Sequence, residues 1–388
     1  DTIVHYLKQP KGIVALAVIG AVVVAGSIYA YTASQGAGSS NGNPFSALVP
    51  KKEPTITTLV DLSKHELTNL DGDAVTAEPM GLAIDASGNI VVAGYNINQI
   101  LTVSSTDGSV STLAGTGSRG YEEGSLGVAK FSSPRGVAVS ESGTTYVTDT
   151  YGLRSISSGR DGMRPSVYRL GKKSLDAVVD EGAVSIDTAT GVAVGINGDI
   201  YVTQSDADGD RVVKVTSSGE TSFVAGVPHG ADHGADSEAL FDDPEGIAID
   251  SSGNLYIADS KNNRIRKVTT DGTVTTFAGS GDEGHVDGTA NDAQFTSPRG
   301  IAFDSKDNLY VIEGWIDGSG GKNHYVRMIT PSGTVSTVTG SAGGGTGSKD
   351  ATASNLASDW SGLHGIAVDK KTDTIYIADG QVIRKIVR

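Results

Sequence analysis

The chain has 388 residues, with 52 glycines, no cysteine and a net charge of −15. The absence of cysteine excludes a disulfide scaffold, a thiolate zinc site and a cysteine nucleophile. The acidic balance argues against a nucleic-acid partner, which would need a basic face. The charge is uneven, because residues 1–54 carry four lysines against Asp1 and Glu53, which leaves −17 for residues 55–388. The two parts therefore differ physically.

Residues 12–33 form an apolar run, GIVALAVIGAVVVAGSIYAYTA, without a charged residue. As an α-helix this run would span about 33 Å, enough to cross a bilayer core. Tyr29 and Tyr31 stand near one end, where interfacial aromatic residues occur. We expect a transmembrane helix over 12–33 that contacts membrane lipid and packs through its small residues against other membrane-protein subunits. A cleaved signal peptide and a pilin-like helix are the alternatives.

The lysines around this run predict its orientation. Lys8 and Lys11 precede it closely, and no further positive charge follows until Lys51. The positive-inside rule then puts residues 1–11 in the cytoplasm and the rest of the chain in the periplasm or outside the cell. Residues 34–54 are rich in Gly, Ser, Asn and Pro, which predicts a tether.

A short motif recurs six times in the acidic part, as MGLAID, RGVAVS, TGVAVG, EGIAID, RGIAFD and HGIAVD. Its glycines stand at positions 81, 136, 191, 246, 300 and 365, at a nearly constant spacing. The fourth unit shows four strands separated by turns: EGIAID, LYIAD, RIRKVTT and TVTTFAG. The alternation of basic and apolar residues in RIRKVTT predicts a strand with one side in water. Four antiparallel strands per unit, repeated radially, predict an all-β fold, a six-bladed β-propeller over 55–388.

The sixth unit stops after three strands, at Arg388. Residues 55–61, TITTLVD, resemble the fourth strand of the other units. We expect this N-terminal strand to join the last blade and close the ring, because closure removes the open edges of a six-blade array.

These units resemble NHL repeats, as residues 246–279 illustrate with GIAIDSSGNLYIADSKNNRIRKVTTDGTVTTFAG. The resemblance covers 55–388 and implies a six-bladed propeller with four-stranded blades. Some propellers that look similar are lyases or hydrolases with a metal in the central funnel. That activity would need matching histidine and carboxylate ligands in this chain.

Strand direction alternates within a blade, so the loops between blades lie on the same face as the loops between strands two and three. We call this the loop face; its long loops span 115–134, 171–190, 226–244, 279–298 and 340–363. Function concentrates on long loops held by a rigid scaffold, so we expect the binding site there.

Two rings of side chains are expected around the central mouth of the loop face. The first ring precedes strand one of each blade and consists of Met80, Arg135, Thr190, Glu245, Arg299 and His364. The second ring ends strand two and consists of Gly94 and the polar residues Asp149, Gln204, Asp259, Glu313 and Asp379. These residues are expected either to form a polar funnel for a ligand or to satisfy the amides of nearby turns.

A calcium site is one further hypothesis. Asp206, Asp208 and Asp210 alternate in a loop, and oxygen ligands at this spacing suit Ca²⁺, although the twelve-residue EF-hand loop is absent. An exposed acidic loop is the alternative. The sequence contains no GxSxG, Walker, HExxH or CxxC motif. We therefore expect a protein that is not an enzyme and has no cofactor; bound calcium is the alternative to the absence of a cofactor.

The sequence predicts a membrane-anchored, extracytoplasmic propeller that binds a protein partner or serves as an accessory structural subunit of a larger membrane assembly. One alternative is a filament subunit with the apolar helix in the fibre core. Another is a metal-dependent lyase or hydrolase, or a ligand sensor, that uses the central funnel.

Overall fold

In the computed structural model the chain divides into two compact units, residues 1–52 and 53–388. The structure describes residues 19–24, 27–32, 55–65, 67–68, 74–157, 166–170, 186, 188–205, 209–226, 240–314, 324–341, 351–352 and 362–388. The predicted N-terminal segment 1–11 and the tether 34–54 lie outside the described residues.

The described part of the first unit is a pair of antiparallel strands, β1 (Ile19–Val24) and β2 (Ser27–Thr32). These residues do not form the helix predicted over 12–33. Six of the twelve are β-branched, which restricts the side-chain rotamers and favours a strand. Across the described residues, no helix has the length and apolarity needed to span a membrane.

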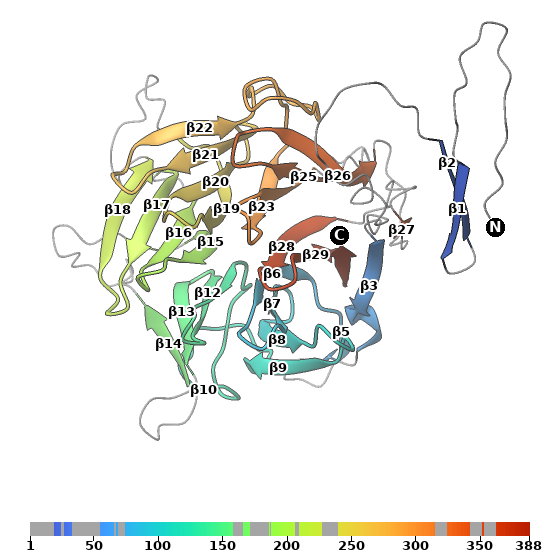
Figure 1. Cartoon of the computed structure of the whole chain (residues 1–388). Helices are drawn as coiled ribbons and strands as arrows, with labels where there is room; N and C mark the ends of the chain where they lie inside the picture. Colours follow the sequence, from blue (N-terminus) through green and yellow to red (C-terminus); the bar gives the residue numbers. More distant parts are fainter. Residues whose placement is uncertain are drawn as a thin grey trace, which may run out of the picture. The chain divides into compact units, whose positions relative to one another are not determined.

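The second unit is a ring of six antiparallel sheets, the blades (Figure 1). Blades 1 to 3 consist of β6 (Pro79–Ile84), β7 (Ile90–Gly94), β8 (Gln99–Val103) and β9 (Val110–Ala114); β11 (Val137–Val139), β12 (Thr145–Asp149), β13 (Gly152–Ser157) and β14 (Ser166–Leu170); and β15 (Ala189–Val194), β16 (Ile200–Gln204), β17 (Arg211–Val215) and β18 (Thr221–Gly226). A short strand, β10 (Gly124–Ser125), extends the outer edge of blade 2 by pairing with β14.

Blades 4 to 6 follow the same plan. They consist of β19 (Pro244–Ile249), β20 (Leu255–Asp259), β21 (Arg264–Val268) and β22 (Val274–Ala278); β23 (Pro298–Phe303), β24 (Leu309–Glu313), β25 (His324–Ile329) and β26 (Val335–Ser341); and β28 (Leu363–Asp369), β29 (Thr374–Asp379), β30 (Val382–Val387) and β3 (Thr55–Asp61). The six-bladed, four-stranded architecture predicted from the repeats is therefore present.

The ring closes through β3, as the sequence predicted. This N-terminal strand pairs antiparallel with β30, with Thr55 opposite Val387 and Asp61 opposite Val382. On its outer side β3 pairs with β27 (Ala351–Thr352). Between β3 and blade 1 the chain forms a 3-10 turn, η1 (Leu62–Lys64), and a small hairpin of β4 (Leu67–Thr68) and β5 (Ala74–Val75). One blade thus joins the two ends of the propeller.

The hydrophobic core lies between neighbouring blades. Strand two of a blade is covered on both faces, and all five residues of β7, β12, β20 and β24 are buried. A strand covered on both faces has apolar residues on both sides, as in IVVAG of β7.

Glycine at the start of each innermost strand lets adjacent blades approach each other. A Cβ atom added to Gly136 would lie 2.7 Å from the carbonyl oxygen of Thr190 in the next blade. The recurring glycines therefore bring the residues that precede them to the centre of the ring.

Candidate functional site

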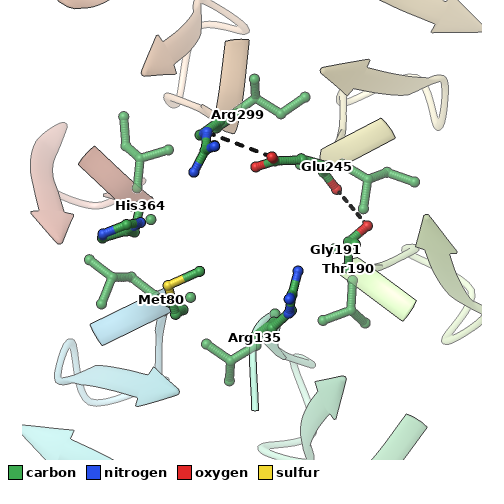
Figure 2. A pocket seen from close by; sticks show the side chains of 18 residues that line it. Met80, Arg135, Thr190, Gly191, Glu245, Arg299 and His364 are labelled. Atoms are coloured by element: carbon green, nitrogen blue, oxygen red, sulfur yellow. Dashed lines mark hydrogen bonds and ion pairs between the residues drawn. The ribbon is translucent and has the colours of Figure 1, made fainter. Parts of the chain in front are cut away.

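All six residues of the predicted first ring line one central pocket (Figure 2). Each is brought there by the innermost strand of a different blade. The pocket has a volume of about 130 Å³. Strand one runs away from the loop face, so the wall continues beyond the first ring as six glycines and then as an apolar ring of Leu82, Val137, Val192, Ile247, Ile301 and Ile366. The pocket is therefore polar at its mouth and apolar further in.

Two arginines face each other across this pocket, Arg299 from blade 5 and Arg135 from blade 2 (Figure 2). Glu245, from blade 4, lies beside Arg299, with 3.6 Å between the Arg299 Nε and the Glu245 Oε1. Burial raises the pKa of Glu245 above its usual value, against the opposing effect of the two guanidinium groups.

Arg135 has a different environment from Arg299. Its guanidinium lies 5.7 Å from the centre of the Tyr95 ring, within the range of a cation–π contact. Within the described part of the chain, no carboxylate oxygen comes within 4.0 Å of the Arg135 side chain. The pocket thus holds two guanidinium groups against one carboxylate, inside an acidic propeller.

His364 contributes an uncharged imidazole to the pocket wall. Burial lowers its pKa to about 4, and the charges of Arg299 and His324 add to this effect. Its Nδ1 atom is buried and has no hydrogen-bond partner among the described residues. The Thr190 hydroxyl, in contrast, has a partner in the pocket wall, because it donates to the carbonyl oxygen of Pro244 at 2.8 Å. At neutral pH the pocket therefore carries one positive charge in excess.

The predicted second ring does not line the central pocket. Its five polar residues are buried between blades, each beside an arginine of strand three. The closest distances are 3.6 Å for Asp149–Arg154, 3.1 Å for Gln204–Arg211, 3.2 Å for Asp259–Arg266, 2.6 Å for Glu313–Arg327 and 2.7 Å for Asp379–Arg384.

The acidic members also accept backbone amides of the loops that enter their blades. Asp259 accepts the amide of Asp242 at 2.8 Å, and Glu313 accepts the amide of Thr296 at 2.8 Å. Satisfying turn amides was the alternative interpretation of this ring, and the geometry agrees with it. These residues therefore hold the loop face in shape.

The buried arginines of strand three were not predicted from the sequence pattern. Arg266, in the segment RIRKV, is only 4% exposed, so this side of β21 does not face water. Its guanidinium lies 5.9 Å from the centre of the Phe241 ring and donates to the carbonyl oxygen of Leu240. The sequence of the first blade could have indicated this pairing. There, Gly94 stands at the position of Asp259, and Leu101 stands at the position of Arg266. The first blade therefore lacks both the acid and the arginine, as expected if the two residues act as a pair.

Of the three predicted calcium ligands, Asp206 and Asp208 lie outside the described residues. Asp210 accepts the amide of Asp243 at 2.9 Å. Asn98 and Asn263 do the same for the corresponding loops of blades 2 and 5. Asp210 therefore has a structural role that an asparagine fills elsewhere. The described residues contain no group of three metal-ligating side chains.

Two long loops on the loop face form a matched pair, 115–134 before blade 2 and 279–298 before blade 5. Each contains an isolated parallel bridge at an equivalent place, Arg119–Phe131 and Glu283–Phe295. Each also leads directly into one of the two pocket arginines. Since blades 2 and 5 are three apart in a ring of six, these loops lie on opposite sides of the pocket.

The matched loops carry aromatic contacts at equivalent positions. Tyr121 packs against Tyr151 with 5.3 Å between ring centres, and His285 stacks on Tyr325 at 4.6 Å. Apolar groups here face solvent, because Tyr121 is 63% and Val286 is 50% exposed. The loop face thus offers both an ionic pocket and apolar side chains around it.

Comparison with known proteins supports the repeat assignment. The family model named NHL repeat matches residues 241–268, which cover β19, β20 and β21. The chain is 26% identical over 258 residues to the chloroplastic Protein SUPPRESSOR OF QUENCHING 1 of Arabidopsis thaliana, covering 62% of this chain and 24% of that protein. It is 25% identical over 307 residues to Teneurin-4 of Homo sapiens, covering 66% of this chain and 11% of that protein. The chain therefore spans a quarter or less of these relatives.

A solved structure described as an auxiliary nutrient binding protein, from Bacteroides thetaiotaomicron VPI-5482, has a similar fold. The TM-score is 0.62 at 17% sequence identity, over 95% of this chain and 82% of that one. At this identity the likeness is one of fold.

Proposed function

We propose that this protein is a membrane-attached binding protein whose extracytoplasmic propeller docks a protein partner on the loop face. The observation that carries the proposal is the matched pair of loops around the central pocket. They expose Tyr121, Val128 and Val286 on a rigid, closed scaffold. Tyrosine is enriched in protein interfaces, and long loops on rigid scaffolds are common binding sites. The net charge of −17 over residues 55–388 favours a protein over a nucleic acid.

Site-specific photo-crosslinking in cells tests this docking surface. A photoreactive amino acid replaces Tyr121 on one loop, Val286 on the opposite loop, or Ile196 as a matched control. Ile196 is 80% exposed and lies in a turn on the opposite face of blade 3. We expect adducts of one defined size from positions 121 and 286, and none of that size from position 196. Equal adducts from all three positions, or none from either loop, would reject the proposal.

Membrane attachment is the part of the proposal that rests on residues 12–33. Twenty-two residues without a charge need a cover of lipid or protein. The full chain should stay in the membrane pellet at alkaline pH, and a variant with Val22→Arg and Val23→Arg should be released. External protease should digest the propeller in intact cells or spheroplasts. Recovery of the wild-type chain in sheared fibres would favour the filament alternative instead.

The proposed role is binding rather than catalysis, with no resident cofactor. Among the eighteen residues that line the central pocket, His364 is the single imidazole and Glu245 the single carboxylate. A metal-dependent lyase or hydrolase would need a larger ligand set around one ion. Metal analysis of the purified full chain tests this point, and stoichiometric Ca²⁺ or Zn²⁺ that resists dialysis would contradict it.

A further inference from the structure

We propose that the central pocket is a receptor for a single carboxylate group, held between Arg135 and Arg299. This inference rests on the proposed binding function and names the chemistry recognised at its centre. The carboxylate belongs either to a free small acid or to an acidic side chain of the docked protein.

The geometry favours a flat anion with two acceptor oxygens. Arg135 and Arg299 reach the pocket from opposite blades and face each other (Figure 2). A guanidinium presents a planar fork of N–H donors that matches a carboxylate. The Arg299–Glu245 separation of 3.6 Å is long beside the 2.6 Å of the buried Arg327–Glu313 pair. Glu245 therefore holds Arg299 less tightly than Glu313 holds Arg327.

The charge of the pocket favours a monoanion. Two guanidinium groups oppose one carboxylate while His364 is neutral, so one negative charge brings the pocket to balance. A dianion would add a second negative charge close to Glu245, where repulsion in a half-buried site is costly. Carboxylate therefore fits better than phosphate or sulfate.

The size and lining of the pocket favour a short apolar stem on that carboxylate. A volume of about 130 Å³ holds only a few non-hydrogen atoms. Beyond the polar ring the wall is apolar, formed by side chains such as Leu82, Val192 and Ile301. A short aliphatic acid would place its oxygens at the arginines and its methylene groups against this apolar wall.

Calorimetric titration of the full chain tests the inference, with propionate as the probe and propionamide as its neutral isostere at equal ionic strength. We expect propionate to bind and propionamide to bind at least tenfold more weakly. Arg135→Gln should weaken propionate binding at least tenfold, and Arg135→Lys should give an intermediate loss because the fork is missing. Lys261→Gln is the matched control, because this substitution also removes a positive charge from the loop face. The Lys261 side chain lies outside the pocket and is 64% exposed.

Three results would overturn the inference. One is equal binding of propionate and propionamide. Another is unchanged propionate binding in an Arg135→Gln protein whose melting temperature matches the wild type. The third is tighter binding of inorganic phosphate than of propionate.

Competition between the probe and the crosslink separates the two sources of the carboxylate. If the docked protein supplies it, saturating propionate should reduce the adduct formed at position 121 in a membrane preparation. If a free acid is the ligand, the adduct should be unchanged. A persistent adduct with no propionate binding at all would remove this inference and leave the proposed docking function standing.

Discussion

Arg327 and Glu313 form a buried ion pair, with 2.6 Å between the Arg327 Nη1 and the Glu313 Oε1. The same guanidinium donates to the carbonyl oxygens of Gln294 and Val286 and pairs with Asp287 at 2.6 Å. One arginine on strand three thus fixes the end of strand two and the loop 279–298. Because that loop carries Val286 and leads into Arg299, the pair supports both the docking surface and the pocket.

Arg327→Leu should therefore destabilise the propeller by about 3–5 kcal/mol, because it leaves Glu313 buried without its partner. Adding Glu313→Leu should recover part of that loss, since the first blade has Leu101 and Gly94 at these positions and no such pair. Chemical denaturation of the three proteins measures both steps. A double variant that is less stable than the single one would contradict the argument.

The second prediction concerns the closing strand β3 and compares substitutions at two neighbouring residues on its opposite sides. Ile56 is buried in the last blade, whereas Thr57 is exposed. Ile56→Asp should cost more than about 3 kcal/mol by burying an unpaired charge at the point of ring closure. Thr57→Asp should stay within about 0.5 kcal/mol of the wild type. Similar melting temperatures for the two variants would mean that β3 does not close the ring in solution.

The central glycines make a third prediction. A methyl group at Gly191 would lie 2.8 Å from the hydroxyl oxygen of Thr203 and also crowd the next blade. Gly191→Ala should lower stability by about 1–3 kcal/mol, because the innermost strands must move apart. Gly127→Ala is the control, since nothing lies within 4 Å of its added methyl group. Equal stability of the two variants would show that the ring centre tolerates expansion.

The first ring could be predicted because each member directly precedes a recurring glycine. Once six equivalent units close into a ring, residues such as Arg135 and Arg299 must meet at its centre. The partners of the second ring could not be predicted, because position along a strand does not reveal which neighbour a side chain meets. Asp259 faces Arg266, a buried arginine of its own blade. The alternation of basic and apolar residues in this strand wrongly predicted that Arg266 faces solvent.

The N-terminal segment shows a different limit of sequence reasoning. An uncharged run such as 19–32 suits a helix or a strand, because apolar residues alone carry no periodicity that separates the two. Its β-branched residues were the available signal for strands.

The last prediction is that the stability of the protein depends on pH through the His364 imidazole. Its pKa is about 4 in the folded protein and 6.5 in the unfolded chain. Between these values the unfolded chain binds a proton that the folded protein does not, so stability is lost as the pH falls from 6.5 towards 4. The loss attributable to this group reaches about 3 kcal/mol, at about 1.4 kcal/mol for each pH unit. His364→Gln removes the titrating group, so its unfolding free energy should fall less steeply over this range. Denaturation of both proteins at several pH values gives the difference directly, and parallel curves would mean that His364 titrates normally and is not enclosed by the pocket.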